Sequence, residues 1–530
     1  MNVFIYRRCV IPGQRGYWMS TVIFVAILYE PFCWQLQFGK LHKQITSCSP
    51  CRKAGSMFPY LKLCFVLLAI TFIPSTKAQL AEPGALSEVQ AAAVKSITEK
   101  QILSTVSFLA SDEMAGRNTP STELTIASAY VAARFRGAGL EPLGDDGSYF
   151  QVYQMQMSKP PALGIALSLS TGDEILNKGL LAAGDKPELI TAKVLTEAEA
   201  MAADAPEIVL IDELMIPPQA ANRASLVIAT LSRRIKGLTS KGARVILMKC
   251  SSDSVLPEVA LALQQQPSRN VEGLRPECPV ILVKATDDLA GKEMNVTVPA
   301  QDTLEMPVRN VIGVLRGCDK QLAQEAILVS AHLDHIGTRS EGGDLINNGA
   351  DDNATGVTAV LSLADAFSSM PSSPQRSLIF ATFWGEEKGL LGSKEFAKTP
   401  TWPLNKLIAN VNIEMVGRPE TDAREKAWMT GWQHSNLGSL MNAGASRVGV
   451  TVFDRPDVGE MLYTRSDNYS LVQKGVVAHS FSAGSLHADY HQPSDEWEKL
   501  DLPHMTRVIQ GLFAGILHVT DDDVSVTPAQ

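Results

Sequence analysis

Four largely apolar segments constrain the fold of this 530-residue chain most strongly. They are "EAILVSAH", "RSLIFATFW", "LIANVNIE" and "GVVAHSF", and helical patterns separate them. Strands that are apolar on both faces are typical of parallel sheets covered by helices on each side. Residues 304–522 are therefore predicted to form a three-layer α/β/α domain with a mixed, mostly parallel sheet.

The chain before this domain has two parts with different hydrophobic patterns. Residues 79–158 show helical periodicity, as in "ITEKQILSTVSFLASDEMAGR", and are predicted to be a helical lead-in that packs on residues 304–522. Residues 159–303 contain short apolar strands between Ala-rich or polar stretches and carry no histidine. This pattern predicts a smaller inserted α/β or β-rich domain. Residues 523–530 are predicted to be a polar tail.

The first 78 residues differ from the rest in charge, with nine Lys and Arg against the single acid Glu30. From Met57 the chain has the parts of a secretory signal: Lys62, an apolar core and small residues up to Ala78. We expect a signal peptide at 57–78, export to the periplasm or extracellular space, and no membrane span after cleavage. A membrane anchor is the alternative, although the apolar run is short for a span. Residues 1–56 are either a misassigned start or an additional anchor.

The charge of the chain limits the classes of binding partner, and its cysteines bear on the redox compartment. Without its basic leader, the chain is more acidic than its overall formal net charge of −9, so nucleic acid is excluded as a partner. Three cysteines follow the leader, Cys250, Cys278 and Cys318. An oxidising compartment permits a Cys250–Cys278 bridge, and free buried thiols are the alternative.

Histidines and carboxylates gather where the apolar strands end. All eight histidines after the leader lie between His332 and His518. His332 ends its strand, and Asp334, two residues later, can accept the second ring N–H of a metal-binding histidine. Asp351 lies in a Gly-flanked turn before a helix, where helix capping by the following Asp352 or Asn353 explains only one of the two adjacent acids.

The stretch "FWGEEKG" places Glu386 and Glu387 directly after an apolar strand. Two adjacent carboxylates there would repel each other and lose solvation, a cost that a bound dication removes. A solvated turn is the alternative. With Glu414, His487 and His491 near further strand ends, the nitrogen- and oxygen-rich set suits two zinc ions at the carboxyl edge of the sheet.

These motifs resemble a known family. The segments "AHLDHIG", "NNGADDNATG", "FWGEEKGLLGS", "NIEMVGR", "RSDNYSLVQKG" and "HADYHQPSDE" are similar to those of secreted co-catalytic di-zinc aminopeptidases. That group is related to glutamate carboxypeptidase, glutaminyl cyclase and transferrin receptor. The lead-in "FLASDEMAGRNTPS" resembles bacterial exported members, and residues 159–303 resemble a protease-associated insert.

The resemblance implies an exported aminopeptidase that hydrolyses the N-terminal bond of peptides through a hydroxide bridging two zinc ions. His332 and Glu414 would hold one ion, Glu387 and His491 the other, and Asp351 would bridge them. Asp334 would orient His332, Glu386 would be the general base and Tyr463 would stabilise the oxyanion. His335 and His487 lie near ligand positions, but the motif spacing favours His332 and His491. Glu414 stands where most relatives have aspartate, a change that could alter metal preference.

Three other functions fit the same motifs. A glutaminyl cyclase would work with a single zinc ion. A carboxypeptidase would need an arginine to clamp the substrate carboxylate, for which Arg418 and Arg465 are candidates. A binding protein with a dead site, as in the transferrin-receptor branch, would have lost ligands, whereas every ligand position of this chain holds a competent residue.

Overall fold

The structure is a computed structural model that describes residues 84–529, apart from residues 160, 162–163, 184–185, 217–223, 266–267, 270–276, 340–341, 421–422, 485 and 522. The chain divides into two units, Met1–Ala81 and Glu82–Gln530. The predicted leader and its signal peptide therefore lie outside the described residues. Within the part that is described, no helix is both long enough and apolar enough to cross a membrane.

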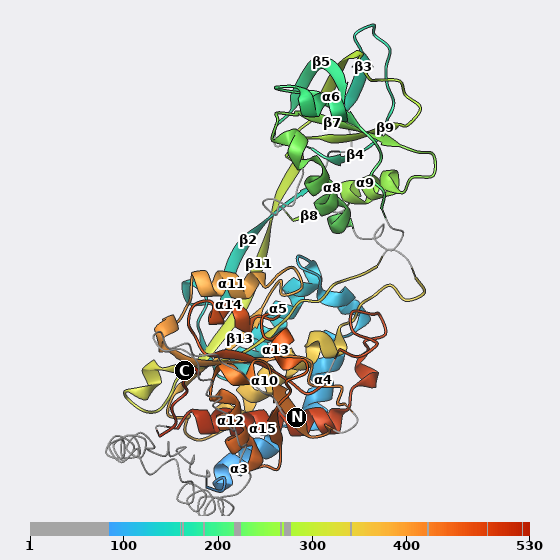
Figure 1. The fold of residues 1–530 in the computed structure, drawn as a ribbon. Helices are drawn as coiled ribbons and strands as arrows, with labels where there is room; N and C mark the ends of the chain where they lie inside the picture. Colours follow the sequence, from blue (N-terminus) through green and yellow to red (C-terminus); the bar gives the residue numbers. More distant parts are fainter. Residues whose placement is uncertain are drawn as a thin grey trace, which may run out of the picture. The chain divides into compact units, whose positions relative to one another are not determined.

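The larger sheet has ten strands in the order β16-β15-β17-β14-β12-β13-β11-β2-β8, with β1 paired to β11. Its long strands β2 and β11 run side by side in Figure 1. Its centre is parallel, since β12 runs parallel to β13 and β14, and β14 to β17. Antiparallel partners extend it, among them β11 beside β13 and β15 beside β17. The α/β class with a mixed sheet is confirmed, and the parallel part is its centre. The strands are β1 (Glu141–Pro142), β2 (Phe150–Lys159), β8 (Ser268–Arg269), β11 (Asp302–Leu315), β12 (Ala326–His332), β13 (Ser377–Phe383), β14 (Leu407–Ile413), β15 (Lys426–Met429), β16 (Thr451–Asp454) and β17 (Ala478–Ser482).

Helices cover both faces of this sheet because its central strands alternate apolar side chains between two cores. Ile327 and Val329 of β12 face the core shared with α4, α5, α10, α12 and α15, whereas Leu328 faces the core shared with α11 and α14. The helices are α3 (Glu88–Ser96), α4 (Glu99–Leu109), α5 (Thr122–Gly137), α10 (Gly356–Ser368), α11 (Leu391–Lys398), α12 (Leu437–Ser446), α13 (Gly459–Leu462), α14 (Asn468–Val472) and α15 (Leu502–Val519).

Side-chain caps fix where several of these helices begin. Ser121 caps α5 by accepting a hydrogen bond from the amide of Leu124, and Asp501 caps α15 by accepting one from the amide of His504. Between α4 and α5 lies the short helix η3 (Asp112–Arg117), which ends on a fully buried arginine. The lead-in therefore enters the core rather than only covering it.

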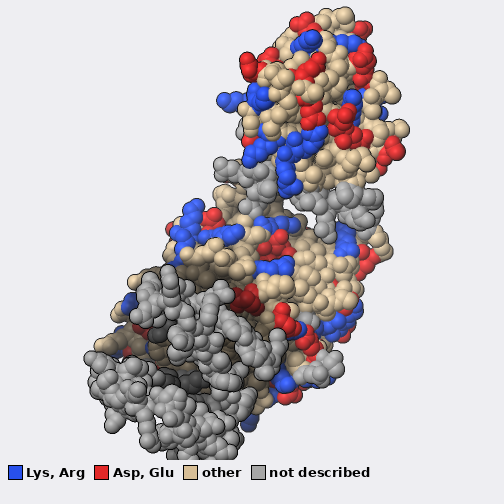
Figure 2. Space-filling view, in the orientation of Figure 1, with Lys and Arg blue, Asp and Glu red and all other residues tan. Residues whose placement is uncertain are grey.

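A second sheet of seven strands has the order β3-β10-β5-β6-β7-β9-β4. Its strands β5, β6, β7 and β9 are parallel to their neighbours in that run, and its cysteines Cys250 and Cys278 are free and buried. On the face of the molecule in Figure 2, Lys and Arg are interspersed with Asp and Glu. The elements are β3 (Ala166–Leu169), β4 (Asn177–Ala182), β5 (Glu188–Thr196), α6 (Glu197–Ala202), β6 (Ile208–Ile211), α8 (Ala224–Thr239), β7 (Val245–Cys250), α9 (Leu256–Gln265), β9 (Val280–Lys284) and β10 (Glu293–Val298).

Candidate metal centre

The parallel centre of the larger sheet brings the predicted side chains to one edge. His332 is the last residue of β12 and pairs with Phe383, the last residue of β13, so the two strands end level. Gly385 then turns the chain with a φ of 68°, and Glu386 and Glu387 follow it. Glu414 comes directly after β14 on the other side of β12. The carboxyl ends of neighbouring parallel strands thus carry the site.

A first group of possible ligands consists of His332, Asp352 and Glu414. Nε2 of His332 lies 3.2 Å from Oδ1 of Asp352 and 3.2 Å from Oε2 of Glu414. Three donors hold the Glu414 carboxylate in place: the Asn412 amide and the Ser466 hydroxyl on Oε1, and the Asn353 amide on Oε2. The longer side chain of glutamate at this position is therefore fixed by its own network.

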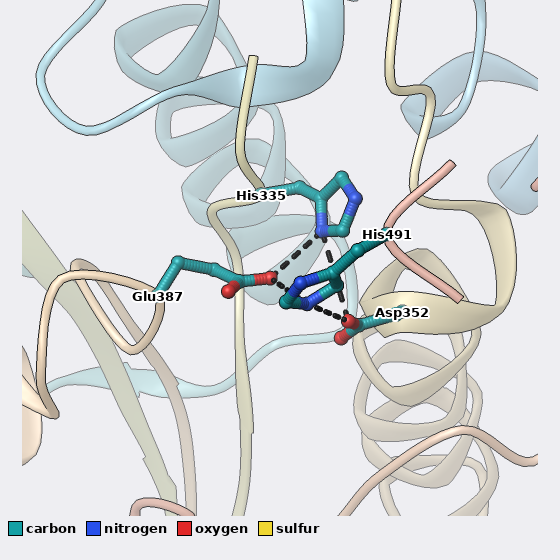
Figure 3. A group of neighbouring side chains, drawn as sticks. All are labelled: His335, Asp352, Glu387 and His491. Atoms are coloured by element: carbon teal, nitrogen blue, oxygen red, sulfur yellow. Dashed lines mark ion pairs between the residues drawn. The ribbon is translucent and has the colours of Figure 1, made fainter. Parts of the chain in front are cut away.

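A second group consists of His335, Asp352, Glu387 and His491 (Figure 3). Nε2 of His491 lies 3.1 Å from Oδ2 of Asp352 and 3.2 Å from Oε1 of Glu387. Nδ1 of His335 lies 2.9 Å from the same Glu387 oxygen and 3.8 Å from Oδ2 of Asp352. Asp352 belongs to both groups and presents a different oxygen to each.

Three atoms of the second group are buried without a hydrogen-bond partner: Nδ1 of His335, Oε1 of Glu387 and Nε2 of His491. Burial of a polar atom without a hydrogen-bond partner costs free energy. Several such atoms that face one another therefore indicate a site for a bound ion or ligand. Imidazole nitrogens and carboxylate oxygens are the ligands that zinc accepts. The second group therefore fits a zinc ion, and the first group offers ligand atoms of the same kinds.

The structure brings Asp352 into the groups, where the sequence analysis predicted Asp351. Oδ1 of Asp351 instead accepts a hydrogen bond from the Gly417 amide at 2.8 Å, and its Oδ2 lies 3.2 Å from Nε2 of His487. Asp495 accepts hydrogen bonds from the backbone amides of both aspartates and so fixes the bend that separates their carboxylates. Two adjacent acids in a turn point in different directions, and the sequence does not tell which one faces the groups.

His335 is the second difference from the expected ligand set, in which motif spacing favoured His332 and His491 alone. Its ring is fully buried and lies edge-on to the ring of His491, with 5.4 Å between centroids. His487, the other histidine near the ligand positions, contacts Asp351 rather than either group. The signal for His335 was its place three residues after a strand-ending histidine.

Asp334 contacts two residues of the site, His332 and Glu386. Its backbone carbonyl lies 3.0 Å from Nδ1 of His332, whereas its carboxylate Oδ1 is 3.9 Å from that nitrogen and accepts a hydrogen bond from the Glu386 amide. The hydroxyl of Thr119 donates to the other carboxylate oxygen. Asp334 therefore fixes the His332 ring through its backbone and the Glu386 turn through its side chain.

Glu386 is separate from both ligand groups among the described residues. Burial raises the pKa of its carboxyl well above the usual range, and the nearby acids Asp467 and Glu414 add to this while His332 opposes it. Strongly perturbed carboxyl pKa values of this kind are enriched at catalytic sites.

Two tyrosines differ in their surroundings. Tyr463 stacks on His434, with ring centroids 4.4 Å apart, and burial raises the pKa of its phenol to about 12. Tyr490, which no sequence pattern singled out, stacks on the ring of His491, with 3.9 Å between the ring centroids. Burial, with the carboxylates of Asp352 and Glu387, raises the pKa of the Tyr490 phenol, so both hydroxyls stay protonated and able to donate.

Arg117 also contributes to the site, although no sequence pattern singles it out. Arg117 is 1% exposed, and its guanidinium donates hydrogen bonds to backbone carbonyls of the lead-in and of the two loops that carry histidine and aspartate ligands. The acceptors are Leu333 and Gly349 at 3.0 Å, Asn348 at 2.8 Å, and Leu109. Arg117 thus ties the lead-in to both ligand loops.

One family model matches the part of the chain that contains the site. Residues 310–515 match the model of Peptidase family M28. This segment contains both groups of ligands, so the chain is similar to that family in the part that carries the site.

The chain is similar to aminopeptidase YwaD of Bacillus subtilis, with 23% identity over 280 residues that cover 51% of this chain and 56% of that protein. It is also similar to a probable glutamate carboxypeptidase of Arthroderma benhamiae, with 24% identity and coverage of 45% and 34%. The chain thus spans only about half, or less, of the length of these curated relatives. Among solved structures, the aminopeptidase from Aneurinibacillus sp. strain AM-1 has 17% identity and a TM-score of 0.48, covering 83% of this chain and 97% of that one.

Proposed function

We propose that this protein is an exported zinc-dependent aminopeptidase that removes N-terminal residues from peptides. The observation that carries the proposal is the position of Asp352, whose two oxygens face two different groups of ligands. His332 and Glu414 would hold one ion, and His491 and Glu387 the other. When bound, the two ions would supply Lewis-acid polarisation of the scissile carbonyl and activation of the attacking water.

The residues of this chain would do the rest of the chemistry. Glu386 would take a proton at its carboxylate and deliver it to the leaving amine, a role that suits its raised pKa and its amide held by Asp334. The surplus of carboxylates around the site would attract the cationic amine of a free N-terminus. This attraction favours exopeptidase action at the N-terminal end of the substrate.

Carboxypeptidase activity is the second candidate, and one observation favours it. Arg418 pairs with Asp489 at 3.1 Å through one nitrogen, while its Nη1 is buried without a hydrogen-bond partner. A substrate carboxylate would satisfy that nitrogen. Arg465 is exposed, and so is a weaker candidate for a clamp.

A set of matched peptides separates these functions. The same sequence would be offered with a free or acetylated N-terminus and with a free or amidated C-terminus, before and after treatment with a chelator. We expect hydrolysis that requires the free N-terminus, tolerates the amide and stops on chelation. Cleavage of the acetylated peptide but not the amide would support carboxypeptidase action, and cyclisation of N-terminal glutamine without hydrolysis would support a cyclase.

The domain division and the export are parts of the same proposal. The strands β3 to β7, β9 and β10 form a sheet of their own within residues 159–303, which supports an insert of the protease-associated type there. N-terminal sequencing of the protein recovered from the culture supernatant or periplasm tests export, with Gln79 as the expected first residue. Recovery with the cell membranes, beginning before residue 57, would contradict it.

A further inference from the structure

The buried ring of His335 has no role in the proposed chemistry so far. The side chain is fully buried, and both of its ring nitrogens lack hydrogen-bond partners. Nδ1 lies 2.9 Å from Oε1 of Glu387, as Figure 3 shows, but neither atom has a hydrogen-bond partner. Proximity to a carboxylate without a hydrogen bond compensates a buried imidazole only in part for its lost solvation.

The backbone around His335 keeps the ring in this position. Gly349 lies so close that a Cβ there would come within 2.5 Å of the imidazole ring, and its φ of 57° also disfavours other residues. On the other side, the His335 amide donates a hydrogen bond to the carbonyl of Arg117. The ring therefore occupies a space shaped for it, with Nδ1 directed at the carboxylates of the second group.

We propose that His335 is a fourth protein ligand in the second group and that it makes the two zinc sites unequal. This inference rests on the proposed function. The second group offers two nitrogens and two oxygens, from His335, His491, Asp352 and Glu387, whereas the first offers one nitrogen and two oxygens. Zinc sites with four protein ligands are closed, and sites with three keep an open position. The second group retains its ion, and the first group holds the exchangeable ion and the open position for water and substrate.

Competition between the protein and a chromophoric chelator for Zn²⁺ measures both dissociation constants. Wild type is expected to bind two ions with constants at least about tenfold apart. In His335→Gln and His335→Ser, the tighter constant should rise about 10- to 100-fold while the weaker constant changes little, because the lost nitrogen belongs to one site only. His491→Gln serves as the positive control, and His518→Gln, on α15 beside Asp521, as the control for a histidine outside both groups.

Unchanged constants in both His335 variants, together with weaker binding in His491→Gln, would overturn the role of His335 while leaving the proposed function intact. A wild type that binds no zinc would overturn both. A second measurement needs no variant: ring ¹⁵N signals of wild type are followed as the first equivalent of Zn²⁺ is added. The signals of His335 and His491 should shift before that of His332, and a first shift at His491 alone would also overturn the inference.

Discussion

Asp351 and Asp352 are adjacent in the chain, but their carboxylates face different partners. Asp352 places one oxygen 3.2 Å from His332 and the other 3.1 Å from His491, whereas Asp351 accepts a hydrogen bond from the Gly417 amide. The Asp351 carboxylate supports the turn, and the Asp352 carboxylate lies between the two groups of ligands. The proposed two-metal site depends on this division of roles.

Replacement of each aspartate by asparagine separates the two roles. Asp352→Asn removes an oxygen from each group, so the protein should lose most of both zinc ions on dialysis. Asp351→Asn should retain zinc at close to two ions per chain and should be less stable by about 1–3 kcal/mol, since buried hydrogen bonds are weakened. Metal analysis and denaturant unfolding of both variants provide the measurement. Zinc retained by Asp352→Asn and lost by Asp351→Asn would reverse the assignment.

Glu386 and Glu387 should also differ in function, the first acting in turnover and the second in zinc binding. Glu386→Gln preserves the shape of the turn and removes the base, so kcat should fall about 10²–10⁴-fold with zinc content unchanged. Glu387→Gln removes a ligand of the second group and should lower zinc affinity first. Steady-state kinetics and metal analysis on the same samples test this. Normal turnover in Glu386→Gln would exclude it as the base.

Arg117 should act on the site without touching the substrate. Arg117→Gln leaves several buried carbonyls without donors, and we expect a loss of roughly 3 kcal/mol in the free energy of unfolding. Zinc affinity should fall as well, because the loops before Asp334 and Asp351 lose their common anchor. Arg309→Gln is the matched control, because Arg309 is partly exposed, donates hydrogen bonds to Ser128 and Thr125 of α5 and lies over the ring of Phe150, away from the ligand loops. Equal losses of stability and zinc affinity in the two variants would contradict a specific role for Arg117.

The two tyrosines give a paired prediction. Burial raises the pKa of both phenols, and nearby carboxylates raise it further. For Tyr490 these carboxylates belong to the site, whereas for Tyr463 the nearby carboxylate is that of Glu460. We therefore expect Tyr490→Phe to lower kcat by roughly 10²-fold, as for loss of an oxyanion donor, with zinc content unchanged. Tyr463→Phe should retain most of the activity. A large loss in Tyr463→Phe alone would instead assign the oxyanion role to Tyr463.

The sequence was informative where the hydrophobic pattern alone determines where a strand ends and which residues stand at that end. Segments apolar throughout predicted a sheet covered on both faces, and His332, Glu387 and Glu414 follow such segments closely enough that the sheet edge brings them together. The choice between Asp351 and Asp352 depended on a backbone bend that Asp495 holds from far along the chain. Arg117 became visible only in three dimensions, because its partners are backbone carbonyls distant in sequence. His335 was near the expected ligands in sequence, but only the fold shows its ring among the carboxylates of the second group.

Anomalous diffraction from a crystal of the zinc-loaded protein, recorded on both sides of the zinc absorption edge, tests the central claim most directly. The account predicts two zinc peaks per chain, each next to a different carboxylate oxygen of Asp352, with Glu386 beside them but not bound. A single peak, or peaks next to Asp351 and His487 with Asp352 turned away, would contradict it.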